Sequence, residues 1–133
     1  MEYHITRTVE SSFGETLKKV EAALAEKGFG VLTEIDVAAT LKKKLDVDFR
    51  PYRILGACNP HFAYQALQGE DKIGTLLPCN VVVQQTTDGR VEVSAMNPLV
   101  AMQMIGNPAV HRVAEEVTRR LRLVVEAVGT AVQ

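Results

Sequence analysis

The sequence predicts an α+β domain of two layers, in which helices pack on one face of a roughly five-stranded, mixed or antiparallel sheet. Three observations indicate this fold. Short segments with alternating apolar residues, typical of strands, are interspersed with segments of helical spacing. Two adjacent segments in the second half form a hairpin pattern, and a long amphipathic helix follows them. Because the 133 residues contain neither repeats nor a linker, we expect a single domain over residues 1–133.

The N-terminal third predicts a strand, a helix and a second strand. Tyr3–Val9 alternates apolar and polar residues, as a strand does. Ser12 and Glu15 have the spacing of a capping box, in which each side chain bonds the backbone amide of the other residue, so a helix begins there. Gly28 ends this helix because glycine adopts the left-handed conformation easily. We expect Phe29–Ile35 to be the second strand.

A short helix and a third strand follow. Asp36 is a suitable N-cap. Pro51 prevents the helix from continuing, and Tyr52–Cys58 is predicted to be a strand. The apolar residues of the short helix recur every four positions: Val37, Leu41 and Leu45.

Three further helices are predicted by one repeated pair of residues, an asparagine followed by a proline. The pair occurs at Asn59-Pro60, Asn97-Pro98 and Asn107-Pro108. Asparagine accepts hydrogen bonds from the free amides of the first turn, and proline occupies a first-turn position where its missing N–H is not needed. Gly69 is expected to end the first of these helices, and Gly106 the second.

The predicted hairpin joins Cys79–Thr86 to Arg90–Met96. A two-residue loop mixes apolar and polar residues on both faces. A three-residue loop over Thr87–Gly89, with the glycine left-handed in a bulge, produces one mostly apolar face. We predict this loop because a one-residue slip would turn that face to solvent. Its register pairs Val81 with Ala95, and Val83 with Val93.

The final helix, predicted over about residues 108–128, has a broad apolar stripe. On its other side Glu115 precedes Arg119, and Glu116 precedes Arg120, by four positions each, which is the favourable order for helix ion pairs. The stripe consists of Val110, Val113, Val117, Leu121, Val124 and Val128.

Composition and charge exclude several classes of partner. The net charge of -1 provides no overall field that attracts nucleic acid or acidic lipid. The basic run Lys42–Lys44 covers the solvated side of its helix, and aromatic residues, at 5%, are too few for the stacking on which single-strand readers depend. No segment resembles a secretory signal or reaches the roughly 18 apolar residues of a membrane span. We therefore expect no nucleic-acid or membrane partner, and a cytoplasmic protein whose cysteines are free thiols.

Polar side chains and thiols are expected to gather at one edge of the sheet. If the strand Tyr52–Cys58 runs antiparallel to Cys79–Thr86, the cysteine-bearing ends of both strands meet there. The Asn97-Pro98 helix start follows the next strand and reaches the same edge. The sequence thus predicts a small polar pocket. Its candidate residues are Cys58, Asn59, His61, Cys79, Asn80 and Asn97.

Two interpretations of Cys58 remain open. It lies directly before a helix N-terminus, where the free amides and the helix dipole favour a thiolate and lower the pKa of the thiol. The other interpretation is a small thiol packed at the end of a strand, as most free cysteines are. Cys79 follows a proline on the apolar face, so we expect it to be buried.

A metal site is a further alternative. Cys58, His61 and Cys79 are three soft ligands suited to zinc or copper. However, a structural zinc site has four ligands at paired spacings, and the chain has no second pair of that kind. We therefore assign no metal, and the sequence leaves the cofactor unknown. Thioethers suited to Cu(I) occur at Met96, Met102 and Met104.

Three segments together carry a resemblance to a known family. They are the octapeptide of residues 53–60, RILGACNP, the nonapeptide of residues 73–81, IGTLLPCNV, and Asn97-Pro98 with Met102. In these segments the chain resembles domain-of-unknown-function family 302, small proteins of bacteria and archaea. The resemblance implies a compact domain of helices packed on a sheet, and it makes a dimer plausible.

The expected function is binding of a small ligand or a protein by a homodimer, in the polar pocket near the two cysteine segments. The alternative is a thiol-based redox or sulfur-handling protein that uses Cys58. The second alternative is a copper- or zinc-binding protein. Whether the chain is an enzyme stays open.

Overall fold

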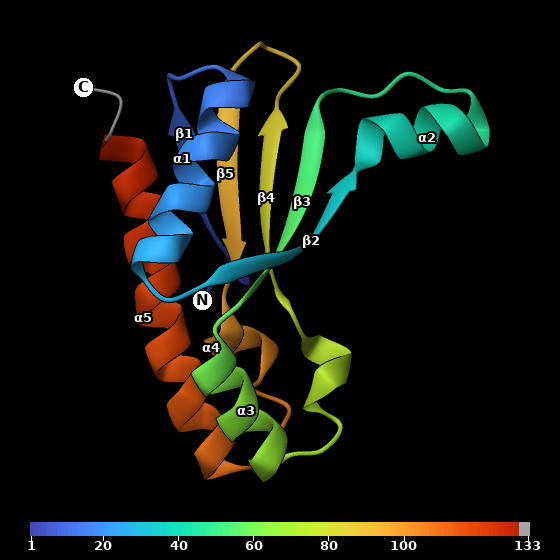
Figure 1. Ribbon diagram of the computed structural model, residues 1–133. Coiled ribbons are helices and arrows are strands. Elements are labelled where there is room, and N and C mark those ends of the chain that lie inside the picture. The colour runs from blue at the N-terminus through green and yellow to red at the C-terminus, as the bar shows by residue number, and fades with distance from the viewer. Residues whose placement is uncertain (131–133) are drawn as a thin grey trace.

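The computed structural model describes residues 1–130, so the last three residues of the predicted domain lie outside the described part. Five strands form one sheet in the order β1-β5-β4-β3-β2, and every neighbouring pair is antiparallel (Figure 1). The predicted α+β class is confirmed, with an antiparallel sheet. The strands are β1 (His4–Val9), β2 (Gly30–Asp36), β3 (Tyr52–Cys58), β4 (Cys79–Gln85) and β5 (Val91–Met96).

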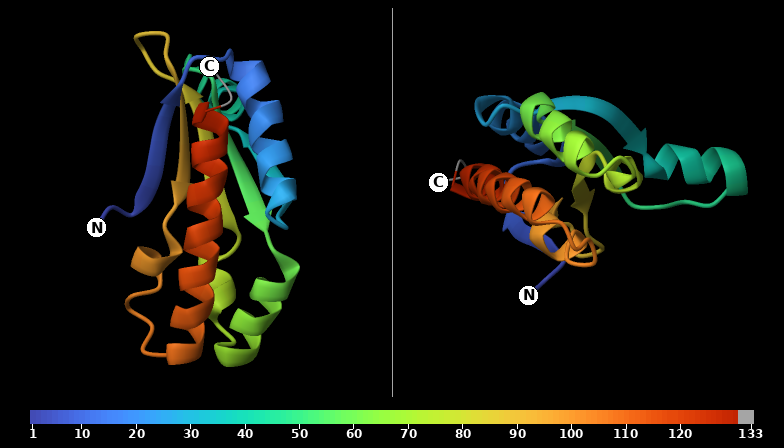
Figure 2. Two further views of the ribbon diagram at one scale, coloured as in Figure 1. Left: turned by 90° about the vertical axis from the view of Figure 1, so that its left-hand side faces the viewer. Right: turned by 90° about the horizontal axis from the view of Figure 1, so that it is seen from below.

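Two helices cover one face of the sheet. Helix α1 (Phe13–Glu26) contacts β2 and β4, and α5 (Pro108–Thr130) contacts β1, β5 and α1 (Figure 2). The predicted apolar stripe of α5 forms the helix side of this core, since Leu121 and Val124 are completely buried. The sheet side of the core consists mainly of Leu55, Val81, Val83, Val93 and Ala95.

The hairpin between β4 and β5 has the predicted three-residue loop. Gly89 has φ +85°, and the register pairs Val81 with Ala95 and Val83 with Val93. All four of these side chains face the helices and are fully buried. The predicted pairing of β3 with β4 is also confirmed, and Ala57 lies opposite Cys79.

The predicted helix starts are present as hydrogen-bonded caps. Asp36 accepts from the amide of Ala39 at 2.9 Å, and Asn107 accepts from that of Ala109 at 3.0 Å. Ser12 accepts from the amide of Glu15 at 3.2 Å. The reciprocal half of this capping box differs from the prediction. The Ser12 hydroxyl itself donates to the Glu15 carboxylate at 2.9 Å, so the carboxylate does not reach the serine amide.

The helix that begins at Asn97 is shorter than predicted. Helix α4 comprises only Pro98–Ala101, so Gly106 does not end it. The chain continues in single turns, in which the amide of Ile105 donates to the carbonyl of Met102. Met102, the residue that follows α4, is buried in a cluster with residues of α3 and α5.

One of the two predicted ion pairs on α5 is wrong. Glu116 pairs with Arg120 as expected, at 2.8 Å, but Arg119 also binds Glu116, at 2.7 Å, and not Glu115. Positions three and four apart are both neighbours on a helix surface, so one carboxylate can accept from two arginines.

Helix α2 (Val37–Leu45) projects from the edge of the sheet (Figure 1). None of its residues is buried, and Leu45 is 66% exposed. The regular spacing of its apolar residues therefore predicted the helix correctly, but these residues are not part of the core.

The part of the molecule below the sheet is a second, smaller packing unit. Helix α3 (Pro60–Gly69), the 3₁₀ turn η1 (Ile73–Leu76) and α4 lie around the first half of α5 (Figure 1). Ala66, Ile73, Met102, Val110 and Ala114 form its buried cluster. Across residues 1–130 the structure has no helix with the length and apolarity needed to cross a membrane.

Candidate functional site

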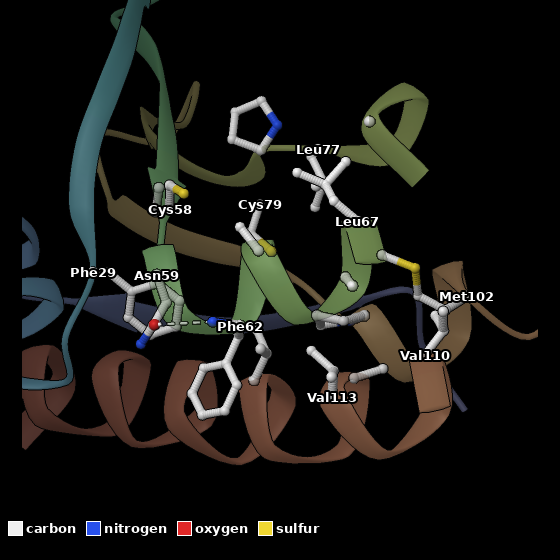
Figure 3. A pocket seen from close by; sticks show the side chains of 18 of the residues that line it. Phe29, Cys58, Asn59, Phe62, Leu67, Leu77, Cys79, Met102, Val110 and Val113 are labelled. Atoms are coloured by element: carbon white, nitrogen blue, oxygen red, sulfur yellow. Dashed lines mark hydrogen bonds between the residues drawn. The ribbon is translucent and has the colours of Figure 1, made fainter. Parts of the chain in front are cut away.

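A cavity of about 350 Å³ lies where the sheet meets this lower unit (Figure 3). This volume is at the lower end of the range found for small-molecule pockets, about 300–1,000 Å³. Its walls come from the ends of β3 and β4, from α3, from the segment before β4 and from α5. Apart from Asn59, the labelled lining side chains are apolar or carry sulfur: Phe29, Cys58, Phe62, Leu67, Leu77, Cys79, Met102, Val110 and Val113.

The cavity exists because small residues stand at positions where several elements meet. Ala57 on β3, Ala63 and Ala66 on α3, and Ala114 on α5 all line it. An alanine has no side-chain atoms beyond Cβ, so four of them on three facing elements leave space that larger residues would fill. Exposed Leu32 on β2 also belongs to the lining, which shows that the cavity opens to the surface on that side.

Three of the six predicted site residues line this cavity: Cys58, Asn59 and Cys79. The antiparallel pairing of β3 with β4 brings the two cysteine segments together, and Asn59 follows Cys58 as the N-cap of α3. The surroundings are apolar, whereas the sequence predicted a polar pocket.

The other three predicted residues lie elsewhere. His61 is exposed in the first turn of α3 and does not line the cavity. Asn80 is exposed and lines a separate concavity, of about 310 Å³, together with Tyr3 and Tyr52. It is separated from Cys79 because successive side chains of a strand point to opposite faces.

Asn97 is buried in a structural role. Its Oδ1 accepts from the amide of Leu99 at 3.1 Å and from the Thr118 hydroxyl at 3.3 Å. Its Nδ2 donates to the carbonyl of Glu2 at 3.1 Å. These bonds join the start of α4 to α5 and to the N-terminal segment, and they leave Asn97 only 2% exposed.

The two thiols on the cavity wall differ in their environment. Cys79 is 8% exposed, and burial, reinforced by the neighbouring Cys58, raises the pKa of its thiol to about 11. Cys79 is therefore protonated at neutral pH and a poor nucleophile. Cys58 is partly exposed, and the structure forms no disulfide between the two.

The residues suggested as metal ligands do not gather. In the part of the chain that the structure describes, no three His, Cys, Asp or Glu side chains are grouped as metal ligands would be. Of the methionines, Met102 lines the cavity, Met96 lines the separate concavity and Met104 is 78% exposed.

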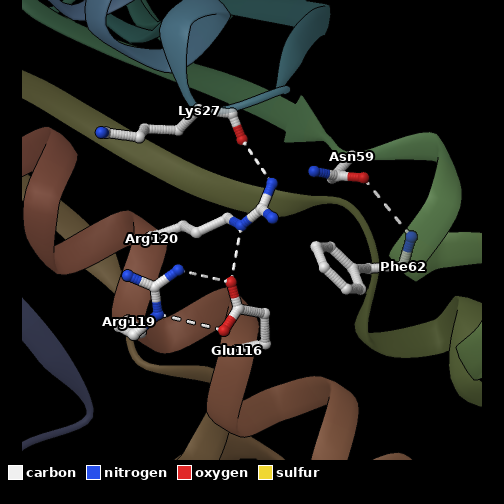
Figure 4. Close-up of polar contacts among 6 residues, drawn as sticks. All are labelled: Lys27, Asn59, Phe62, Glu116, Arg119 and Arg120. Carbon is white, nitrogen blue, oxygen red and sulfur yellow. Dashed lines mark hydrogen bonds and ion pairs between the residues drawn. The ribbon is translucent and has the colours of Figure 1, made fainter.

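Sequence reasoning missed a polar group at the Phe62 end of the cavity (Figure 4). The guanidinium of Arg120 lies over the Phe62 ring, with Cζ 4.9 Å from the ring centroid. Its Nη1 donates to the carbonyl of Lys27 at 3.1 Å, and its Nε donates to Glu116 at 2.8 Å. Helical spacing identified only the ion pair, because contacts with Phe62 and Lys27 connect segments far apart in the sequence.

Hydrogen bonds from Arg119 and then from Arg120 lower the pKa of Glu116 to about 2. The carboxylate is therefore ionised at neutral pH, and it is shared between two arginines. Glu116, Arg119 and Arg120 together therefore carry a net charge of +1.

Comparisons with known proteins agree with the fold. A family model described as domain of unknown function DUF302 matches residues 5–128. The crystal structure of an uncharacterized conserved DUF302 protein from Bacillus stearothermophilus is similar, with a TM-score of 0.89 and 31% sequence identity. The alignment covers 96% of this chain and 98% of that one. No curated protein matches the chain.

Proposed function

This chain belongs to the DUF302 family, a domain of unknown function, and we propose that it binds a small, largely apolar molecule in the cavity at the end of its sheet. The observation that carries the proposal is the lining, which is apolar almost throughout although the cavity opens to the surface. A cavity of about 150 Å³ lined by apolar side chains is known to bind benzene, so one of about 350 Å³ accommodates on the order of ten carbon atoms.

Filling the cavity tests this proposal. A neutral naphthylamine dye that fluoresces in apolar surroundings is the probe, titrated against the full chain. Ala63 lines the cavity from α3, and Ala63→Phe should weaken dye binding by tenfold or more, because the ring occupies the ligand's space. The matched control is Ala22→Phe, at an exposed position of helix α1.

We expect Ala22→Phe to bind the dye like the parent chain, and far-UV circular dichroism to show that both variants are folded. Equal binding by the parent and the Ala63→Phe variant contradicts the proposal. So does a parent chain that does not bind the dye at all.

Thiol chemistry at Cys58 is a second candidate, favoured by the partial exposure of this thiol on the cavity wall. Its test is the pH dependence of alkylation in Cys79→Ser, which retains Cys58 alone, and in Cys58→Ser. We expect the Cys58→Ser variant to react slowly at neutral pH, because the pKa of Cys79 is raised to about 11. If Cys58 reacts no faster than an unfolded thiol, this candidate is excluded. This candidate includes a cytoplasmic location, because the reducing conditions there keep thiols free.

We also propose a homodimer through the sheet face opposite α1 and α5. This face carries apolar side chains beside polar ones, including Tyr3, Tyr52, Val82 and Met96, and a second copy is the partner that would cover it. Sedimentation at high micromolar concentration should show a dimer that Val82→Lys dissociates. Ala25→Lys, at an exposed position of α1, should have no effect. A parent chain that sediments only as a monomer refutes the dimer.

A further inference from the structure

A hydrogen-bond donor without a protein acceptor lies at one end of the cavity. Asn59 is only 8% exposed, and its Oδ1 accepts from the amide of Phe62 at 3.4 Å as the N-cap of α3. This cap fixes the orientation of the side-chain amide, so its Nδ2 is directed away from the helix. Within residues 1–130, Nδ2 donates to no acceptor, and in Figure 4 it points toward the guanidinium of Arg120. Nδ2 itself is not fully enclosed, because within residues 1–130 His111 Nε2 is the one fully buried side-chain nitrogen or oxygen without a hydrogen-bond partner. A ligand can therefore reach Nδ2.

A second donor is held opposite it. The Nε and Nη1 atoms of Arg120 donate to Glu116 and to the Lys27 carbonyl, and the guanidinium stacks on Phe62. These contacts hold the planar group in place. Its Nη2 has no acceptor in the described part of the chain. Glu116 accepts from Nε alone and the Lys27 carbonyl from Nη1, so Nη2 is the nitrogen left for a further acceptor.

The side chains of Asn59 and Arg120 meet beside Gly28, at the exit of α1. A Cβ added to Gly28 would lie 2.9 Å from Nδ2 of Asn59 and 3.4 Å from Nη1 of Arg120. Both groups therefore border the same corner, which stays open because residue 28 has no side chain. Nη1 carries two hydrogens and the Lys27 carbonyl accepts one of them, so an acceptor between the two side chains can bond the other hydrogen together with Nδ2.

The electrostatics of this corner favour an anion. Glu116 is shared by Arg119 and Arg120, so the three side chains carry one net positive charge. The corner also adjoins the cavity, since Asn59 and Phe62 belong to its lining, as does Phe29 directly after the α1 exit. A ligand can thus place an apolar body in the cavity and a charged group at the corner.

We propose that Asn59 and Arg120 bind the head group of a small amphipathic carboxylate, whose hydrocarbon part occupies the apolar cavity. This inference rests on the proposed function and specifies its ligand class. An apolar pocket with a few convergent polar groups that set the orientation is the usual construction of a small-molecule site.

Paired ligands that differ only in the head group test the inference. Octanoate and 1-octanol have the same chain length, and each is titrated by calorimetry into the full chain. We expect octanoate to bind about tenfold more tightly than 1-octanol, which is the effect of one charge-assisted hydrogen bond. Arg120→Gln should remove this preference, so that octanoate binds no more tightly than 1-octanol does.

Two further variants complete the test, the first as a control and the second as a change to the other donor. Arg119→Gln removes the same net charge as Arg120→Gln but leaves the guanidinium that stacks on Phe62, so it should reduce the preference for octanoate less than Arg120→Gln does. Asn59→Asp keeps a good N-cap while it replaces the Nδ2 donor with a carboxylate oxygen. It should abolish the preference in a chain that is still folded.

Each outcome decides one claim. If both ligands bind with equal affinity, or if Arg120→Gln and Asn59→Asp leave the preference unchanged, the head-group inference is overturned and the apolar cavity stands as the proposed site. If neither ligand binds the parent chain, the proposed function itself fails.

Discussion

Gly28→Ala is the substitution whose effect follows most directly from the structure. Gly28 has φ +86° and follows the last turn of α1, where its amide donates to the Ala25 carbonyl at 3.1 Å. An alanine in this left-handed conformation costs about 1–2 kcal/mol. The added Cβ also lies 2.9 Å from Nδ2 of Asn59, a distance at which the buried side chain has to move.

Movement of Asn59 removes the cap of α3, which is worth about 1 kcal/mol. We therefore expect Gly28→Ala to lower the free energy of unfolding by about 2–3 kcal/mol. The matched control is Gly89→Ala in the hairpin loop. Gly89 has nearly the same φ, +85°, but no atom lies within 4 Å of its added Cβ, so only the conformational cost of about 1–2 kcal/mol applies.

Urea unfolding followed by far-UV circular dichroism measures both variants. A double-mutant cycle isolates the contact: in an Asn59→Ala background, Gly28→Ala should cost no more than Gly89→Ala does in the parent chain. Equal losses for Gly28→Ala and Gly89→Ala in the parent chain would refute the reasoning. So would an undiminished loss for Gly28→Ala when Asn59 is absent.

Two further predictions concern α5 and α2. The pKa of Glu116 is lowered to about 2 in the folded chain by Arg119 and Arg120, so its stabilising effect is present above the ordinary value of 4.5 and is lost as the pH falls toward 2. The difference in urea midpoint between the parent and Glu116→Gln should therefore shrink over this interval, and a constant difference contradicts it. Leu121→Ala should lower the unfolding free energy by about 2–5 kcal/mol because Leu121 is fully buried, whereas Leu45→Ala on α2 should change it by less than about 0.5 kcal/mol. Similar losses in both would show that α2 packs in a core.

Features that depend on near neighbours along the chain could be predicted from residue type and spacing alone. The Asp36, Asn59 and Asn107 caps act on amides two or three residues away, so residue type and spacing were sufficient to place them. The three-residue hairpin loop followed from Gly89 and from the alternation of apolar residues, because a slip of one residue would expose the whole face.

The lengths and positions of some elements required the tertiary structure. Helix α4 ends at Ala101, although Gly106 was the only local signal for its end. Helix α2 has the periodicity of a core helix but projects from the sheet. Periodicity states which residues share a face, but not what covers that face.

The candidate site shows the same division. The strand pairing that joins Cys58 and Cys79 was accessible from the pattern, but the destinations of Asn80 and Asn97 depend on which face each residue occupies at the sheet edge. The cavity is space left by alanines on separate elements, and Arg120 reaches its end through contacts with Phe62 and Lys27. Only the folded chain brings such distant residues together, so no local pattern records them.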